Sequence, residues 1–485
     1  MRCVGTWLPT HFVQWSEKMK NQALRMLILL PFLLLFSCKP KDNLLLRQST
    51  SFSLDDLQRR TFHYFWDLAD SINYQIPDRY PTLTFSSIAA TGFGLTTYLV
   101  GIERGYITRK AGAERVLATL QVLYDLPQGE AVSDVSGFHG FFYHFLTLDK
   151  ARRFQEVELS TIDTGLLMAG VLSVMSYFDG KDPKEEKIRQ LADALFRRVE
   201  WDWALNPNQR ISMGWHPEKG FLDNDWHGYN EAMVLLIMAM GSPTHPIPAE
   251  SWQRWCETYE WGTFEGYEHV NFDPLFGHQY SHMYIDFKGI QDDYMRAKGI
   301  DYFENSRRAT LANRAYCIRN PMGFKDYGQN VWGLTACDGA KGVKREWNGQ
   351  MVQFYDYCAR GACAFKIVDD GTIAPTAAGG SIPFAPEECQ AALKTMWEQY
   401  YDQLVGEYGF KDSFNKSYTF DNGLENGWFD VDYLGIDQGP IAIQIENYRS
   451  GLIWKVMKKN PYIIAGLKKA GFKGGWLDGH LNPQD

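Results

Sequence analysis

The segment GWHPEKGFLDNDWHGYNEAM, residues 214–233, gathers side chains that can do acid–base chemistry. It holds four carboxylates, two histidines and four aromatic rings. Glu231 stands where this segment meets the apolar run VLLIMAMG. A glutamate at the positive end of a helix dipole gains only about 0.3–1 kcal/mol, which does not explain the neighbouring residues. Sugar rings would explain them, because their CH faces stack on aromatic rings and their hydroxyls pair with carboxylates and imidazoles.

We therefore interpret this segment as part of a glycan-binding groove whose acids cleave a glycosidic bond. The side chains next to Glu231 that we predict to bind substrate are Trp215, His216, Asp225 and Trp226.

Two further acids precede another apolar segment, in ELSTIDTGLL. Asp163 follows Ser160 by three residues, so a helix capping box is the alternative to a catalytic role. Glu158 lies just before the predicted helix and has no capping role to explain it. Glycoside hydrolysis needs two carboxyl groups across the scissile bond, about 5–5.5 Å apart for retention and about 6.5–9.5 Å for inversion. We predict Glu231, Glu158 and Asp163 as the catalytic candidates; the sequence does not give their separation.

Three other segments supply candidates for substrate binding. Asp134 and His139 lie in AVSDVSGFHGFFYHF, where the alternative for Asp134 is an aspartate that holds a turn. Trp332, in NVWGLTACDG, is a candidate for stacking on a sugar ring.

Glu446 lies in the mostly apolar run IAIQIENYRSGLIW. A buried carboxylate is costly unless it is paired, so it either binds substrate or pairs with Arg449 one turn on. Asp437 is predicted to be the N-cap of the same helix.

Apolar residues recur at helical spacing along most of the chain. Some segments are apolar nearly all round, as buried helices are, and others are amphipathic, as helices covering a surface are. Their alternation predicts an all-α (α/α)6 toroid, an inner ring of helices wrapped by an outer ring; no 34-residue repeat typical of a tetratricopeptide solenoid occurs. The predicted helices are 53–70, 86–105, 108–126, 160–178, 183–203, 228–241, 248–261, 300–320, 385–401, 437–459 and 461–471.

The connections between these helices are long at one end of each hairpin. Those at 206–227, 262–298, 321–384 and 407–436 are rich in Gly, Trp, Asn and Asp. Long ordered loops in a compact domain usually carry function, so the site is expected at the rim that they form.

Composition and motifs exclude several classes of function. The net charge is −9 and no basic block occurs, which argues against a nucleic-acid partner. No HExxH, P-loop or GxSxG motif occurs, so we predict no metal and no cofactor. Of the six cysteines after Cys38, Cys358 and Cys363 could pair with each other or with Cys337 or Cys389; buried thiols are the alternative.

The N-terminus is predicted to be a targeting segment. Lys18, Lys20 and Arg25 precede LILLPFLLLFSC, whose end resembles a lipobox with Cys38 as the lipidated residue. A membrane-spanning helix is the alternative, but the apolar run is too short for the ~30 Å hydrocarbon layer. We expect residues 1–38 to be removed, with Met19 as the true start, residues 39–52 to form a tether, and 53–478 to form one catalytic domain. The protein would then be a monomer at the bacterial cell envelope, attached only through its lipid anchor.

Five motifs together resemble the bacterial glycoamylase-like family: ELSTIDTGLLMAGVL, the segment 214–233, NVWGLTACDG, DDGTIAPTAAGGSIPFAPEE and YLGIDQGPIAIQIENYRSGLIW. That family overlaps glycoside hydrolase family 144, the bacterial endo-β-1,2-glucanases. The resemblance extends from about residue 55 to residue 475. It implies an (α/α)6 barrel, placement at the cell envelope and hydrolysis of β-1,2-glucan with inversion, with Glu158, Asp163 and Glu231 in matching motifs.

Three alternatives remain open at this point. A non-catalytic glycan-binding lipoprotein would share the anchor, the helices and the aromatics. An exo-hydrolase of α-glucan or of another β-glucan is consistent with the family's name. A polysaccharide lyase would need basic residues against uronic acids, and the acidic chain argues against it.

Overall fold

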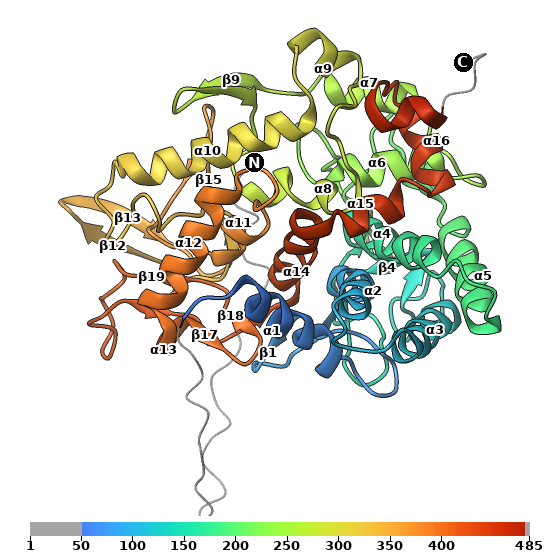
Figure 1. Ribbon diagram of the computed structural model, residues 1–485, viewed down its shortest axis with the longest axis horizontal. Helices are drawn as coiled ribbons and strands as arrows, with labels where there is room; N and C mark the ends of the chain where they lie inside the picture. Colours follow the sequence, from blue (N-terminus) through green and yellow to red (C-terminus); the bar gives the residue numbers. More distant parts are fainter. Residues whose placement is uncertain (1–50, 481–485) are drawn as a thin grey trace, which may run out of the picture. The chain divides into compact units, whose positions relative to one another are not determined.

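Six helices form the inner wall of the computed structural model, which describes residues 51–480 (Figure 1). Neighbouring inner helices contact one another from α2 to α8 and from α11 to α14, and α14 contacts α2 to close the ring. The link from α8 to α11 is made by Gln279, whose side-chain amide donates to the carbonyl of Ala377 at 2.9 Å. The inner helices are α2 (Ile88–Glu103), α4 (Thr161–Tyr177), α6 (Ala232–Gly241), α8 (Tyr280–Tyr284), α11 (Pro375–Gly379) and α14 (Gly435–Ser450).

A second set of helices covers the outside of this ring. The difference in burial follows the sequence pattern: all residues of α6 are buried, whereas α5 buries a stripe that includes Ile188, Leu191 and Leu195 and leaves all but one of its charged residues exposed or half-buried. The outer helices are α1 (Leu54–Asp67), α3 (Arg109–Asp125), α5 (Pro183–Arg197), α7 (Glu250–Cys256), α10 (Tyr302–Arg319) and α12 (Pro386–Gln399). Shorter helices lie in the connections or near the C-terminus: α9 (Asp293–Lys298), α13 (Tyr401–Leu404), α15 (Leu452–Met457), α16 (Pro461–Lys469), η1 (Trp201–Ala204), η2 (Leu275–His278) and η3 (Gly475–His480).

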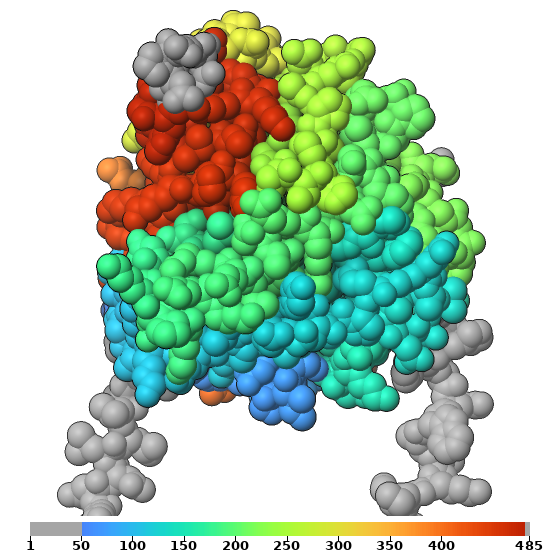
Figure 2. Space-filling model, turned by 90° about the vertical axis from the view of Figure 1, so that its right-hand side faces the viewer, coloured from blue at the N-terminus to red at the C-terminus, as the bar shows by residue number. Residues whose placement is uncertain are grey.

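The C-terminal helices pack on the outside of the ring. Figure 2 shows this red segment lying directly above the green segment that contains α4 and α5. Helix α16 packs on α6, and Arg197 at the end of α5 donates to the hydroxyl of Tyr462 at 2.9 Å. Helix α16 thus covers a part of α6 that the short outer helix α7 does not cover.

Long connections lead into the N-terminal end of each inner helix, whereas short ones leave the C-terminal ends of α2, α4, α6 and α11. The six long connections are 68–87, 126–160, 198–231, 257–279, 320–374 and 400–434. Strands that directly precede inner helices pair with strands of other connections, as β2 (Ser86–Ser87) before α2 does with β5 (Phe145–Leu146). The N-terminal ends of the inner helices therefore share one rim, and the long connections cover it.

Short antiparallel strands fasten the long connections to one another. The largest sheet has five strands in the order β3 (Gly137–Phe138), β4 (Phe141–Tyr143), β6 (Leu159–Ser160), β7 (Gly214–His216) and β8 (Gly220–Phe221). The two-stranded pairs besides β2–β5 are β1 (Arg79–Tyr80) with β21 (Tyr433–Leu434), β9 (Trp261–Phe264) with β10 (Tyr267–Val270), β11 (Ala336–Cys337) with β14 (Cys358–Ala359), β12 (Val343–Trp347) with β13 (Gln350–Phe354), β15 (Gly361–Ala362) with β16 (Ile367–Val368), β17 (Val405–Gly406) with β18 (Gly409–Phe410), and β19 (Phe414–Asn415) with β20 (Trp428–Phe429).

The (α/α)6 architecture predicted from the sequence is confirmed, with three differences in detail. Helices α8, α9 and α11 lie inside segments that the sequence analysis treated as connections. The helix predicted over 437–459 begins at Gly435 and is divided into α14 and α15 at Gly451, whose φ of 66° ends a helix. The short strands at the rim were not predicted.

The predicted targeting segment 1–38 lies outside the described residues, as does nearly all of the tether 39–52. Within residues 51–480, no helix combines the length and the apolar character needed to cross a bilayer. The six cysteines in this range form no disulfide, and five of them are buried, which agrees with the alternative of buried thiols.

The backbones of α2 and α4 approach closely where these helices cross, and the approach depends on two glycines. A Cβ atom on Gly170 would lie 2.2 Å from the carbonyl oxygen of Gly92, and one on Gly92 would lie 2.6 Å from the carbonyl oxygen of Leu166. Backbone cannot move aside as a flexible side chain can, so these two helices pack only if both positions lack a side chain.

We expect Gly170→Ala to lower the free energy of unfolding by about 2–3 kcal/mol, because it forces α2 and α4 apart. Urea denaturation followed by circular dichroism measures this change. The matched control is Gly165→Ala in the same helix, where a Cβ would meet only the side chain of Leu235 at 3.2 Å. That variant should lose less than about 1 kcal/mol; equal losses in both would contradict the explanation.

Candidate active site

His144 joins two of the three predicted catalytic acids. Its Nδ1 lies 2.8 Å from Oε1 of Glu158, and its Nε2 lies 3.5 Å from Oδ2 of Asp163. We call these three residues, with Glu231, the first acidic cluster.

Local backbone structure sets this arrangement. Strand β6 pairs with β4 on one side and with β7 on the other, and the backbone N–H of His144 donates to the carbonyl of Glu158 at 3.0 Å. Ser160 is the N-cap of α4: its hydroxyl accepts from the N–H of Asp163 at 3.2 Å and donates to its carboxylate at 2.5 Å. The helix-capping alternative for Asp163 therefore holds, yet its carboxylate also faces His144.

The charges in the cluster fix which groups are ionised. Burial alone would lower the pKa of His144, but the carboxylates of Asp163 and Glu158 outweigh it and raise the pKa to about 10. For Glu158 burial favours the neutral form, yet the imidazolium of His144 prevails and the pKa is lowered. For Asp163 burial prevails, and its pKa is raised despite His144. At neutral pH His144 and Glu158 thus form an ion pair.

Glu231 occupies the N-cap position of α6, but its side chain makes no capping hydrogen bond. Its Oε2 atom is buried and has no hydrogen-bond partner among the described residues. Burial, with the nearby charge of Asp163, raises the pKa of Glu231 to about 7. A carboxyl group whose pKa lies near neutral pH is suited to protonate a leaving group.

A second acidic cluster, which the sequence analysis missed, lies at the same rim. It comprises Asp338, Asp412, Asp430 and Asp437, from two long connections and the first turn of α14. Carboxyl–carboxyl hydrogen bonds join Asp338 to Asp430 and Asp412 to Asp437, which requires a proton in each pair.

Burial is the main cause of the shifted pKa values in this second cluster. It raises the pKa of Asp437 to about 7 and, with the charges of Asp412 and Asp338, that of Asp430 to about 8. The predicted N-cap role of Asp437 is wrong, because Leu434 occupies the N-cap and Asp437 lies inside the helix. The segments FKDSF and FDVDY, which contain Asp412 and Asp430, are visible in the sequence, but nothing in the sequence indicates that the two segments meet.

Tyr280 connects the two clusters. Its hydroxyl donates to the carbonyl of Ile436, the neighbour of Asp437, at 3.2 Å. Burial raises the pKa of Tyr280 well above the usual value, and the charges of Asp437, Glu231 and Asp163 act in the same direction. Asp78, which pairs with Arg79, contributes to the raised pKa of His144, and Arg79 donates to Asp338 at 2.7 Å. The two clusters therefore belong to one site.

Carboxylate oxygens of Asp338, Asp412 and Asp430 lie within 4.8 Å of one another, a spacing that could hold a metal ion. Calcium takes 6–8 oxygen ligands in proteins, so these three groups alone would leave its coordination incomplete. Shared protons already account for the close approach of the carboxyl groups. The prediction of a metal-free site remains a prediction.

Comparisons with known proteins find relatives that match most of the chain. Residues 223–461 match the family model described as "Putative glucoamylase". The endo-β-1,2-glucanase from Chitinophaga pinensis, solved with sophorotriose and glucose, is 31% identical with a TM-score of 0.75, covering 88% of this chain and 100% of that one. A structure from Bacteroides uniformis, described in the same words as the family model, is 34% identical with a TM-score of 0.75, covering 88% and 99%.

The chain belongs to this glucoamylase-like family. The exo-β-1,2-glucooligosaccharide sophorohydrolase of Parabacteroides distasonis is 30% identical over 453 residues, which are 86% of this chain. The chain spans 57% of the length of that curated relative. The family resemblance stated from the five motifs is confirmed.

Trp215 and His216 are neighbours in β7. Their side chains lie on opposite faces of the five-stranded sheet, because successive side chains of a strand alternate. His216 lies on the face of the first cluster: burial lowers its pKa, and the charge of Glu158 opposes that shift. Trp215 pairs with Leu159 on the other face, where it packs against Phe138 and Trp203. Trp215 therefore supports the sheet, and no contact with the acids places it in the site.

Trp226 and Asp225 also have structural partners. The buried Trp226 donates its indole N–H to the hydroxyl of Thr161 at 2.9 Å, at the start of α4. Asp225 accepts from Arg210 at 2.9 Å and from Asn206 at 2.8 Å. These contacts hold the loop that enters α6.

Two predicted substrate-binding residues are placed elsewhere. Trp332 is 0% exposed and belongs to the core around α10–α12, so it cannot stack on a sugar without unfolding that core. Glu446 lies near the C-terminal end of α14, away from the rim, where Arg104 donates to both of its oxygens at 2.7 Å. The alternative pairing with Arg449 is wrong as well, because Arg449 donates to Asp55 and Gln58.

Asp134 and His139 do not join the acidic clusters. Asp134 is exposed in a turn with φ of 60°, a left-handed conformation that aspartate tolerates, as the turn alternative requires. His139 stacks on Trp203 and pairs with Glu200 at 2.7 Å. Of the predicted residues, the structure thus brings together Glu158, Asp163, Glu231 and His216.

We expect His144→Gln to lower the free energy of unfolding at pH 7 by about 1.5–3 kcal/mol, the range for hydrogen bonds to charged groups. Because the pKa of His144 is raised on folding, this stabilisation is complete below about pH 6.5 and is lost as the pH rises through about 10. Urea denaturation of both proteins at pH 7 and above pH 10 measures it. The difference should shrink at the higher pH.

His63→Gln is the matched control, since His63 pairs with Asp67 at 3.1 Å on the exposed side of α1. It should change the free energy of unfolding by less than about 1 kcal/mol. A loss at His144 that stays constant between the two pH values would contradict the assigned charge state.

Proposed function

We propose that the chain is a glycoside hydrolase that cleaves β-1,2-glucan by an inverting two-carboxylate mechanism. The observation that carries the proposal is a pair of acids at one rim with opposite shifts: the pKa of Glu231 is raised to about 7, so a large fraction is protonated at neutral pH, while the pKa of Glu158 is lowered beside His144. Kinship with β-1,2-glucan hydrolases supports the choice of linkage.

In this mechanism Glu231 is the general acid and protonates the leaving glycosidic oxygen. Glu158 is the general base that activates water, because a base must be ionised at the pH at which the acid is protonated. Its side chain remains 30% exposed, so water can reach it. Asp163 fixes His144 through Nε2 and raises the pKa of Glu231 by its charge.

The second cluster would bind the sugar hydroxyls next to the cleaved bond. Carboxyl groups that share protons can both donate and accept, and sugar hydroxyls demand both. Asp412, Asp430 and Asp437 each have a buried oxygen that receives no hydrogen bond from an N–H or hydroxyl group of residues 51–480, so only the carboxyl groups of the cluster itself compete with a polar ligand for it.

Two alternatives make different predictions. A non-catalytic glycan-binding protein would bind the same sugars without turnover, and the raised pKa of Glu231 would then have no use. An α-glucan or other β-glucan exo-hydrolase would release monosaccharide from another linkage. The relatives include both an endo-acting and an exo-acting enzyme, so the product profile decides between these modes.

We further propose that the protein is a monomeric lipoprotein of the cell envelope, anchored through Cys38. The apolar run that ends at Ser37-Cys38 supports this placement.

We expect Glu231→Gln to lower kcat on linear β-1,2-glucan by about 10³-fold, within the range attributed to general acid catalysis. Reducing-end assays on β-1,2-, β-1,3- and α-1,4-glucans identify the linkage, and NMR of the first product identifies the anomer. The kcat/KM of the natural enzyme should fall above about pH 7, as Glu231 loses its proton.

The matched control is Glu185→Gln, which removes a buried glutamate that pairs with Arg109 at 2.8 Å, outside the rim. It should retain turnover, even where its melting temperature falls. Near-normal turnover in Glu231→Gln would show that another group is the acid, and binding without hydrolysis by the natural chain would favour the glycan-binding alternative.

We expect Cys38→Ala to move the full-length protein, expressed in a bacterial host that lipidates such segments, from the detergent phase to the aqueous phase. The loss of the acylated cysteine is the reason. Phase separation in Triton X-114 followed by immunoblotting measures it. Retention of the variant in the detergent phase would mean that another segment anchors the chain.

A further inference from the structure

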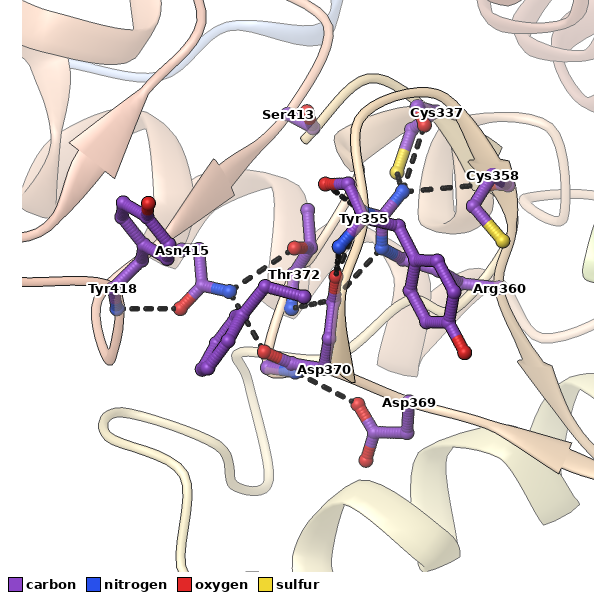
Figure 3. A network of polar contacts seen from close by, with 12 residues as sticks. Cys337, Tyr355, Cys358, Arg360, Asp369, Asp370, Thr372, Ser413, Asn415 and Tyr418 are labelled. Carbon is purple, nitrogen blue, oxygen red and sulfur yellow. Dashed lines mark hydrogen bonds and ion pairs between the residues drawn. The ribbon is translucent and has the colours of Figure 1, made fainter. Parts of the chain in front are cut away.

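A turn at residues 355–358 wraps around the side chain of Arg360, in the connection that leads into α11 (Figure 3). The guanidinium donates to the carbonyls of Tyr355 and Asp356 at 3.1 Å, and to that of Cys358 at 3.4 Å. Tyr357 is the residue of this turn whose carbonyl accepts no hydrogen bond from Arg360.

Arg360 is fixed from the other side by Asp370. The two side chains form a fork with two contacts of 2.8 Å, and both are almost completely buried. Asp370 also accepts from the N–H of Tyr355 at 3.0 Å, so the ion pair holds the turn at two points. Gly339 makes room, because a Cβ there would lie 2.1 Å from the guanidinium.

The same guanidinium reaches the second acidic cluster. It donates to the carbonyl of Cys337 at 2.8 Å and to that of Asp338 at 3.4 Å. Asp338 is further held by Asp412, which accepts from its N–H at 2.7 Å, and by Ser413, which donates to its carbonyl at 2.8 Å. One buried cation thus sets the position of Tyr357 relative to these carboxyl groups.

Tyr357 itself is 53% exposed, an unusual state for a large aromatic residue beside buried acids. Its hydroxyl makes no hydrogen bond within the described part of the chain. Burial of that hydroxyl, together with the charges of Asp437, Asp412 and Asp338, raises the pKa of Tyr357 well above its usual value. Strand β11 pairs with β14 with Cys337 opposite Cys358, so the next residues, Asp338 and Tyr357, face each other at the edge of the second cluster, where the Tyr357 side chain remains accessible.

We propose that Tyr357 is a substrate-binding residue whose ring stacks on a sugar held by the second acidic cluster, and that Arg360 is its positioning residue. Carboxyl groups would take the hydroxyls of that sugar while the aromatic ring covers its CH face. The proposal rests on the proposed function, since it names residues that bind the same glucan.

Tyr357→Ala should raise KM for linear β-1,2-glucan about tenfold and change kcat by less than about threefold, as loss of a stacked ring would. Tyr357→Phe keeps the ring and should stay within about twofold of the natural KM. A KM unchanged in Tyr357→Ala, or raised equally in Tyr357→Phe, would overturn the stacking role.

A double-mutant cycle tests the role of Arg360. Arg360→Lys keeps the charge opposite Asp370 but loses the planar fork, and should raise KM about fivefold in the natural background. In the Tyr357→Ala background it should raise KM less than about twofold, because the side chain that it positions is already gone. Additive effects would overturn the positioning role.

Arg104→Lys is the matched control for a weakened buried ion pair. Arg104 forms the same kind of fork with Glu446, away from the rim. It should lower the melting temperature and leave KM unchanged. Absence of both hydrolysis and binding in the natural protein would overturn this inference together with the proposed function; hydrolysis with an unchanged KM in Tyr357→Ala would overturn the inference alone.

Discussion

The carboxyl groups at the rim lie too close together and too deep for all of them to be ionised at once. Each carboxylate that leaves water needs a cation, a hydrogen-bond donor or a proton. The first cluster receives a cation, the imidazolium of His144, whereas the second has only Arg79 for several acids and keeps protons instead. The protonation states that the chemistry requires thus follow from how few cations the fold places there.

The ring of helices creates this crowding. Inner helices α4, α6 and α14 begin at the same rim, and each carries one of Asp163, Glu231 and Asp437 within its first turn or at its N-cap. The positive ends of the helix dipoles favour negative charge there, but by less than burial costs. The pKa of Glu231 is raised for this reason, although it occupies a position where glutamate is usually stabilised in its charged form.

The sequence analysis predicted the site residues that share one segment with a long apolar helix. It missed those that the fold brings together from segments far apart in the chain. Glu158, Asp163 and Glu231 each precede or open a long apolar helix, a pattern visible in one segment. Helices α8 and α11 escaped prediction because five residues give too little periodicity. Trp332 and Glu446 were misplaced because residue type alone does not distinguish a buried tryptophan from a stacking one, or an acid paired by a distant arginine from one that faces a ligand.

The second cluster could not be predicted, because the fold brings its members together from distant parts of the chain. Its four aspartates stand at positions 338, 412, 430 and 437, and no spacing along the chain relates them. Asp338 is placed by the carbonyls that Arg360 gathers, and Asp412 by its bond to the N–H of Asp338. Such a cluster could be inferred only from knowing that the connections 320–374 and 400–434 meet over α14. The buried pair of Arg360 and Asp370 is therefore better understood as a device for bringing those connections together than as a source of stability, because buried ion pairs contribute little net stability.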